Sequence, residues 1–150
     1  MENVQKLEIA GARGTVEVDG VTGIFYKIRV DDEVVKRTKG GWPIPMRNGK
    51  VSKLSSRGIV PGFQKLYMDE ALVYAMGGHV EKWLRALMFL PFLLIFVNQL
   101  FGLILGVLLF FMNISAVKND QMPMPVRAAL PIINTVAGGV ILALLTGMLS

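Results

Sequence analysis

The chain has 150 residues, no cysteine and one histidine, and its 16 Lys and Arg residues outnumber its 11 acids to give a formal net charge of +5. The lack of cysteine excludes disulfides, thiolate catalysis and zinc sites of the cysteine type. One histidine, His79, cannot build a histidine metal site by itself, and we interpret it as a polar residue near a membrane surface. No cofactor and no metal are expected.

The N-terminal half has the pattern of a β-domain. Its first 20 residues contain no apolar segment of the kind that a secretory signal peptide requires. Polar and apolar residues then alternate with the period of two that is typical of strands, as in residues 15–18 and 24–30. Turn sequences separate these runs, and Asn48-Gly49 is the strongest because both residues accept the positive φ of a type I′ turn. The sequence predicts a small all-β domain, an antiparallel sandwich or open barrel, over residues 1–78.

A short internal repeat supports hairpins in this domain. Residues 27–35 match residues 65–73 in seven of nine positions by residue class, 38 positions further on, and each copy fits a strand, an acidic turn and a second strand. Two interpretations stay open: a duplicated hairpin, or the independent use of the same turn chemistry. The second copy also fits a helix capped by Asp69, although we favour the strand.

A basic stretch occupies the middle of the chain. No acid occurs between Glu33 and Asp69, whereas eight Lys and Arg residues do. Each cation held near an anionic leaflet contributes about 1 kcal/mol, so we expect a surface that docks on membrane lipid or a partner, with nucleic acid less favoured. The alternative interpretations are solvated edge-strand cations and, for the tryptophan, a plug over the end of a small core. The expected surface comprises Lys36, Arg37, Lys39, Trp42, Arg47, Lys50, Lys53, Arg57 and Lys65.

Residues 79–85 form a predicted juxtamembrane segment behind the pair Gly77-Gly78. Trp83 lies there between Lys82 and Arg85. An amphipathic indole between two long cationic side chains is typical of an anchor at the membrane interface.

Two uncharged runs follow, residues 86–117 and 128–150. About 20 helical residues cross a hydrocarbon core of about 30 Å, so each run is long enough to span a membrane. We predict one transmembrane helix over 86–112, a short non-cytoplasmic loop over 113–127 and a second transmembrane helix over 128–150. A basic domain ahead of the first span indicates a multi-pass protein of the cell membrane with both termini in the cytoplasm.

Small and polar residues recur every four positions in both runs and predict helix-packing faces. Such faces serve the two helices of one chain, or other transmembrane helices in a homo-oligomer or a hetero-complex. The amides, including Gln99, are expected to act as hydrogen-bonding groups between helices, with a pore lining as the alternative. The predicted packing residues are Asn98, Gly102, Gly106, Asn134, Thr135, Gly139, Ala143 and Gly147.

The sequence contains no phosphate-binding loop, no nucleophile elbow and no zinc-protease motif. Its paired acids fall at predicted exposed turns, where no catalytic role is expected. The leading hypothesis is a non-catalytic accessory, adaptor or regulatory subunit of a larger membrane assembly. The first alternative is a homo-oligomeric channel or membrane-disrupting effector gated by the β-domain, and the second is a membrane-bound enzyme acting on a lipid or a phosphorylated substrate.

Overall fold

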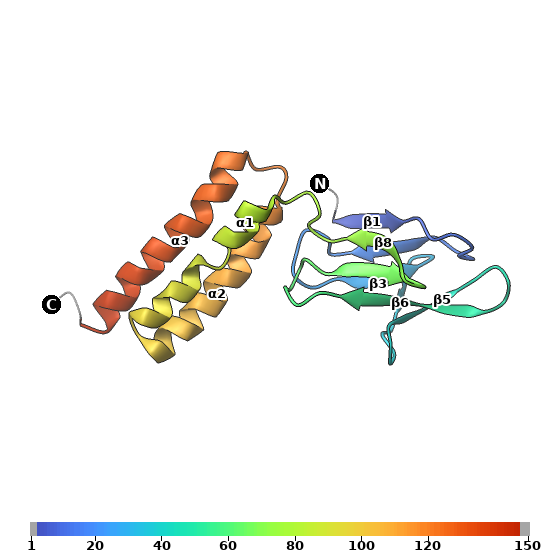
Figure 1. Cartoon of the computed structure of the whole chain (residues 1–150), viewed down its shortest axis with the longest axis horizontal. Helices are drawn as coiled ribbons and strands as arrows, with labels where there is room; N and C mark the ends of the chain where they lie inside the picture. Colours follow the sequence, from blue (N-terminus) through green and yellow to red (C-terminus); the bar gives the residue numbers. More distant parts are fainter. Residues whose placement is uncertain (1–2, 148–150) are drawn as a thin grey trace. The chain divides into compact units, whose positions relative to one another are not determined.

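The computed structural model describes residues 3–147 and divides the chain into two compact units. The first is a β-domain that ends at Gly78, and the second is a helical unit that begins at His79 (Figure 1). Residues 1–2 of the predicted β-domain and residues 148–150 of the predicted second span lie outside the described residues.

The β-domain consists of two four-stranded antiparallel sheets, so the predicted antiparallel β-domain is confirmed. In each sheet every strand pairs with its neighbour in the sequence, which makes both sheets simple meanders. The first sheet comprises β1 (Val4–Leu7), β2 (Val16–Asp19), β3 (Lys27–Val30) and β4 (Glu33–Val35). The second comprises β5 (Trp42–Pro45), β6 (Val51–Arg57), β7 (Lys65–Met68) and β8 (Ala71–Ala75).

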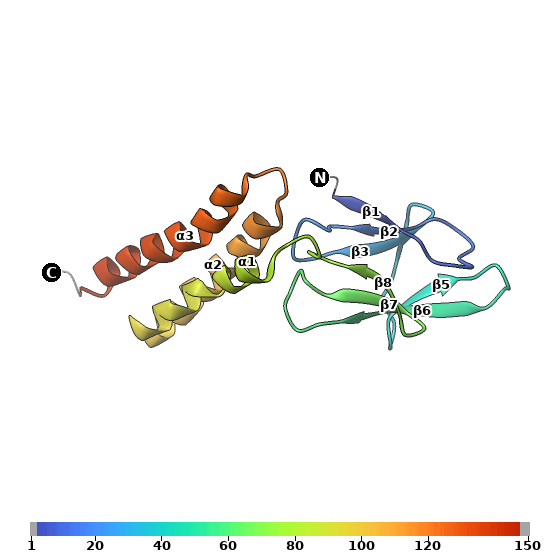
Figure 2. The same ribbon diagram turned by 45° about the horizontal axis from the view of Figure 1, so that its top comes forward.

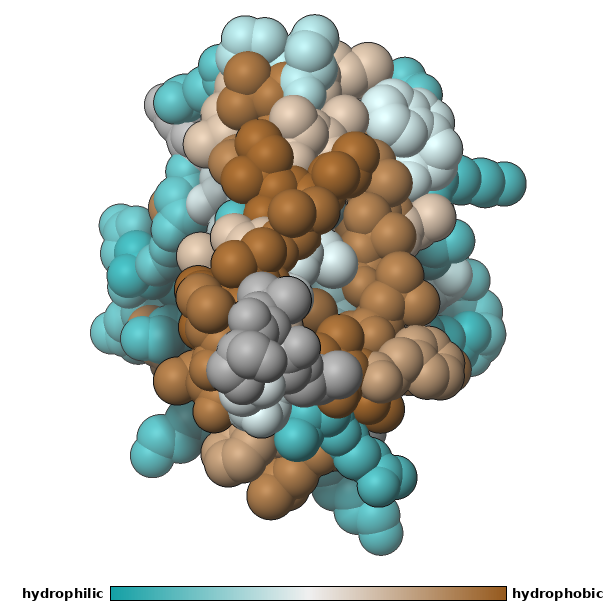
Figure 3. Space-filling model, turned by 90° about the vertical axis from the view of Figure 1, so that its left-hand side faces the viewer, coloured by the Kyte–Doolittle hydropathy of each residue, from teal (hydrophilic) through white to brown (hydrophobic). Residues whose placement is uncertain are grey.

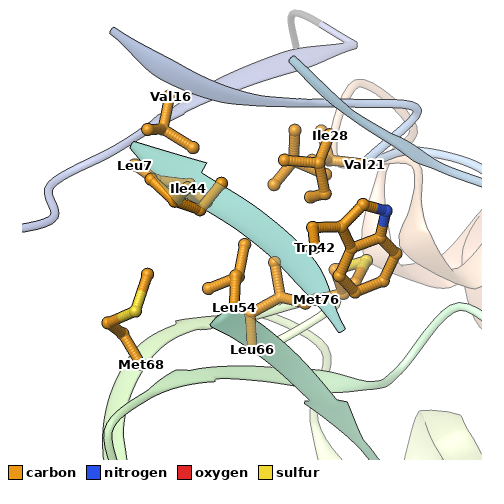
Figure 4. Close-up of a cluster of buried hydrophobic side chains, with 11 residues drawn as sticks. Leu7, Val16, Val21, Ile28, Trp42, Ile44, Leu54, Leu66, Met68 and Met76 are labelled. Atoms are coloured by element: carbon orange, nitrogen blue, oxygen red, sulfur yellow. The ribbon is translucent and has the colours of Figure 1, made fainter. Parts of the chain in front are cut away.

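One hydrophobic core joins the two sheets. Val16 and Val18 of β2 are buried, while the residues that alternate with them carry charge, as the period of two requires. Ile44 of β5 and Leu54 of β6 are fully buried in the same cluster (Figure 4). The sheets therefore lie face to face, with one face of each against the core (Figure 2).

The two sheets repeat one plan 38 positions apart. β3 begins at Lys27 and β7 at Lys65, and each leads into a two-residue acidic turn. Asp31 and Asp32 have φ of 49° and 67°, and Asp69 and Glu70 have φ of 48° and 68°, so both turns have the same left-handed backbone. The repeat thus extends over whole sheets, which favours a duplication, and the second copy is a strand hairpin rather than a helix.

The helical unit contains four elements: α1 (Lys82–Leu87), the 3-10 helix η1 (Leu90–Phe96), α2 (Gln99–Lys118) and α3 (Met124–Leu145). At 20 and 22 residues, α2 and α3 are about 30 and 33 Å long, long and apolar enough to cross a membrane. α1 and η1 together form a shorter segment that runs antiparallel to α2. α3 in turn runs antiparallel to α2.

The predicted single helix over 86–112 is wrong, because the first apolar run folds back on itself. The chain turns at Asn98, whose backbone is extended (φ −150°, ψ 125°) and whose side chain accepts a hydrogen bond from the N–H of Phe101. This is an N-cap, so a new helix starts at Gln99. On the other side of the turn, Pro91 lies at the start of η1, where its missing N–H is tolerated.

The predicted loop over 113–127 is wrong for a related reason: α2 continues to Lys118, and only residues 119–123 separate it from α3. Nε2 of His79 lies 2.9 Å from the carbonyl oxygen of Lys118, so the helical unit begins beside the end of α2. We call this the proximal end, and the end with Asn98 and Leu145 the distal end. The start of the helical unit and the end of α3 therefore lie at opposite ends, which does not support two termini on one side.

Candidate functional site

The structure divides the predicted basic surface into three groups. Lys36, Arg37 and Lys39 lie in the connection from β4 to β5, and Arg47 and Lys50 lie beside the β5–β6 turn. Lys53, Arg57 and Lys65 belong to β6 and β7. All eight cations are exposed, but they lie in these three parts of the β-domain and not on one strand or loop.

Trp42 does not belong to this surface, because it is only 6% exposed and lies in the core cluster (Figure 4). Its ring lies 5.7 Å from the ring of Tyr26, just before β3, and the guanidinium of Arg37 stacks over it at 5.0 Å. The plug interpretation therefore describes this residue, and Arg37 covers its outer edge.

The outer face of the second sheet is the most basic part of the β-domain. Lys53, Arg57 and Lys65 are exposed there, and Nζ of Lys53 donates to the carbonyl oxygen of Lys39 at 2.6 Å. The outer face of the first sheet carries acids among its cations, such as Asp19, which pairs with a guanidinium of β3 at 3.1 Å. The net positive charge of the β-domain is thus concentrated on the outer face of its second sheet.

One acid compensates part of this charge. A carboxylate oxygen of Glu70, in the β7–β8 turn, accepts a hydrogen bond from Nη2 of Arg57 at 2.7 Å. This bond, with the charge of Arg57, lowers the pKa of Glu70 below its ordinary value and raises the pKa of Arg57. The same guanidinium lies over the ring of Tyr67 at 4.7 Å, so Arg57 is held flat against the sheet.

An open depression of about 480 Å³ lies at the β1–β2 connection of the first sheet. Arg13, Asp31 and Arg47 line it, so it holds charges of both signs. A carboxylate oxygen of Asp31 already accepts the backbone N–H of Thr15 at 2.9 Å. Among residues 3–147, no group of three His, Cys, Asp or Glu residues is placed to hold a metal.

The predicted interface anchor lies on α1. Lys82 and Trp83 are exposed, Arg85 is half-buried, and Leu84 between them is fully buried. Nε1 of Trp83 donates to a carboxylate oxygen of Glu81, so the indole is held at the N-terminal end of the helix.

The small residues of the first run pack within the chain. A Cβ on Gly102 would lie 2.1 Å from the carbonyl oxygen of Leu94, and one on Gly106 would lie 2.9 Å from that of Pro91. Both glycines therefore let α2 approach η1 closely. Asn98 is not a packing residue, because it caps α2.

The small residues of the second run lie beside the face that α3 buries. Gly138, Leu142 and Pro131 are buried, whereas Thr135, Gly139 and Ala143 are half-buried and Gly147 follows the helix. Of the predicted packing residues in this run, Asn134 makes a polar contact with α2, since its Nδ2 donates to Oδ1 of Asn113 at 2.9 Å. The predicted stripe is therefore displaced by about one residue from the contact face.

Sequence reasoning missed the polar contacts near the proximal end. Nε of Arg127 donates to the carbonyl oxygen of Val117 at 2.9 Å and so satisfies a backbone group in the last turn of α2. Arg127 and Asn113 are buried, as is Lys118, whose carbonyl oxygen lies beside His79. A signal for Asn113 was present, because it continues the helical spacing that starts with Gly102 and Gly106.

The exterior of the helical unit is apolar. Large side chains are more than half exposed along α2, such as Phe101 and Leu108, and along α3, such as Val136 and Leu144. Figure 3 shows hydrophobic residues covering much of the visible surface. The described part of the unit thus has an apolar exterior along its helices, and its interior is apolar too apart from the buried Asn113, Lys118 and Arg127.

Comparison with protein-family models, curated proteins and solved structures finds no match to this chain. Its function is therefore inferred from its own geometry.

Proposed function

We propose that this protein is an integral membrane protein that acts as a non-catalytic accessory or adaptor subunit, with the helical unit in the bilayer and the β-domain offered to a partner. The observation that carries the proposal is the apolar exterior of the helical unit, along α2 and α3. In water, this exterior would form a larger exposed apolar patch than monomeric soluble proteins retain. In lipid the same exterior is solvated, and the half-buried Asn134 donates to Oδ1 of the buried Asn113 while the buried Arg127 donates to a backbone carbonyl, which are partners that lipid cannot supply.

The cations of the helical unit indicate which of its ends faces the cytoplasm. Lys82, Arg85, Lys118 and Arg127 are all at the proximal end, and residues 86–117 and 128–150 contain no charge. Lys and Arg close to the ends of spans favour the cytoplasmic side. We therefore place the proximal end and the β-domain in the cytoplasm, with the distal end on the other side of the cell membrane. This orientation replaces the expectation that both termini are cytoplasmic.

The outer face of the second sheet is the proposed partner surface. Lys53, Arg57 and Lys65 provide cations on adjacent strands, with Tyr67 between them. This combination fits an acidic protein segment, because exposed cations accelerate association and an aromatic ring adds contact area. The support is the charge difference between the two sheets.

The test is purification of the full chain from its native membrane in a mild detergent, followed by native mass spectrometry. We expect a companion protein in fixed stoichiometry, and a chain that is monomeric without one contradicts the accessory function. The double variant Lys53→Glu and Lys65→Glu should lose the companion. The control, Lys6→Glu and Lys27→Glu, makes the same charge change on the other sheet, where Lys27 is the counterpart of Lys65 in the repeat, and should keep it.

A further inference from the structure

Two loops at one end of the β-domain expose large apolar side chains. Phe25, in the loop of residues 20–26 between β2 and β3, is 86% exposed, and Ile59, in the loop of residues 58–64 between β6 and β7, is 98% exposed. Neither loop contains an acid. The two loops occupy equivalent places in the two sheets, so the domain presents the same feature twice.

These loops lie at the same end of the domain. The hydroxyl of Tyr26, just before β3, donates to the hydroxyl of Ser56 near the end of β6 at 3.0 Å. Both views of the ribbon place the two loops together, opposite the β3–β4 and β7–β8 turns (Figures 1 and 2). The loops that carry Phe25 and Ile59 therefore belong to one end of the domain.

The chain leaves the β-domain at this same end. The N–H of Met76 donates to the carbonyl oxygen of Gln64 at 3.0 Å, and a Cβ on Gly77 would lie 2.6 Å from the ring of Phe63. Residues 76–81 connect β8 to α1, and six residues reach at most about 21 Å. The apolar loops are thus tethered within a short distance of the start of the helical unit.

Charge is polarised along the strands in the sense that an anionic membrane requires. Lys27 follows the first loop directly and Lys65 follows the second, and both are exposed. The acidic pairs Asp31-Asp32 and Asp69-Glu70 lie at the far ends of the same strands, and Asp19, which directly precedes the first loop, is neutralised by an ion pair with Arg29 at 3.1 Å. Apolar tips followed by cations match the interface of a bilayer, where apolar groups enter the acyl boundary and cations meet the headgroups.

We infer that loops 20–26 and 58–64 dock the β-domain on the bilayer that holds its own helical unit, with Phe25 and Ile59 inserted at headgroup level. The inference rests on the proposed membrane insertion. The loops and the cations that follow them meet lipid, so Lys65 lies where the two proposed surfaces adjoin, and the part of the outer face around Lys53 stays free for a soluble protein.

The test uses the full chain in vesicles of phosphatidylcholine and phosphatidylglycerol. Because the chain has no cysteine, single variants Phe25→Cys and Ile59→Cys carry one environment-sensitive fluorophore each. The controls are Val34→Cys and Leu72→Cys, two apolar residues that are 53% and 55% exposed near the acidic turns. Leu108→Cys, in the middle of α2, reports on membrane insertion itself.

We expect lipids that carry a quencher near the headgroup to quench the probes at positions 25 and 59 but not those at 34 and 72. Probes at 25 and 59 that remain unquenched, or that are shielded from water without being quenched by lipid, overturn the inference, and the second result indicates a second copy or another protein. If a quencher placed deep in the acyl chains quenches the probe at position 108, the helical unit is inserted in the bilayer, even when the loops do not dock. A lack of quenching at 108 refutes the insertion itself.

Discussion

A Cβ built on Gly102 would lie 2.1 Å from the carbonyl oxygen of Leu94, closer than any side-chain carbon approaches a backbone oxygen. This contact joins two halves of one uncharged run and folds it into a hairpin. The hairpin returns the chain to the proximal end, where the end of α2 meets His79. The direction of α3, and with it the proposed orientation in the membrane, depends on this fold-back.

Substitution of Gly102 by alanine should therefore destabilise the helical unit. The methyl group meets backbone on the η1 side, which cannot rotate away, so overpacking should cost at least about 2 kcal/mol. The thermal stability of the purified chain in detergent measures the effect. Gly139→Ala is the control, because its Cβ would meet only a leucine methyl at 3.5 Å, and it should be tolerated. Equal stability of the two variants would contradict the close contact between η1 and α2.

The amide pair between α2 and α3 can be tested by a double-mutant cycle. Nδ2 of Asn134 donates to Oδ1 of Asn113, which is fully buried. Loss of one such bond between membrane helices costs about 0.6 to 2 kcal/mol. Asn134→Leu should thus destabilise the unit, whereas Asn113→Leu combined with it should cost less than the two single changes together, because no buried amide is left unpaired. Additive costs would show that the two amides act independently.

Arg127 should be required for stability through its geometry as well as its charge. Its guanidinium bonds the carbonyl oxygen of Val117 from a buried position. Arg127→Lys keeps the positive charge but loses the planar fork, so we expect a loss of about 1 to 2 kcal/mol with the orientation unchanged. Unfolding in detergent and labelling in cells measure the two effects separately. Lys82→Arg, at an exposed position, is the control and should change neither.

The ion pair of Arg57 and Glu70 predicts a pH dependence of the β-domain. Because the hydrogen bond from Arg57 lowers the pKa of Glu70 below its ordinary value of 4.5, the contribution of the pair is complete above that pH. It is lost as the pH falls through the lower pKa of the folded state. Glu70→Gln should therefore flatten the loss of stability in the acid range, as followed by circular dichroism of the sheet signal.

The control for this pH dependence is Glu33→Gln, an exposed acid at the start of β4. It should leave the acid-range profile close to that of the unchanged protein. An equal flattening in both variants would mean that general charge repulsion, rather than the bond to Arg57, sets the profile.

The β-domain was predictable because its signals are local. Alternation in residues 15–18 is found again as β2, and Asn48-Gly49 lies in the β5–β6 turn. Only Gly49 has a positive φ there (81°), so the turn is placed as expected but is not the type I′ turn that the sequence suggested. The partial repeat of residues 27–35 at residues 65–73 also indicated that two strand hairpins share one plan. The sequence did not show that Phe25 is exposed and Trp42 is buried, because burial depends on which aromatic side chain is covered when the two sheets pack.

The helical unit was predictable in composition but not in path. A hydropathy average does not change where the chain turns at apolar or neutral residues. The run through Pro91 and Asn98 was therefore interpreted as one span. The N-cap chemistry of Asn98 was visible, yet an amide between apolar residues also fits helix packing. Consequently the predicted loop over 113–127 placed Lys118 and Arg127 at the end opposite His79, whereas the carbonyl oxygen of Lys118 lies beside His79.

Substituted-cysteine labelling in intact cells tests the proposed membrane fold most directly. Gln99→Cys lies at the distal turn and Gln121→Cys in the proximal loop, both at exposed positions of a chain without cysteine. The account predicts that a membrane-impermeant maleimide labels Gln99→Cys in intact cells and labels Gln121→Cys only after permeabilisation. Labelling of Gln121→Cys from outside, with Gln99→Cys protected, would contradict it and restore a single straight span over residues 86–112.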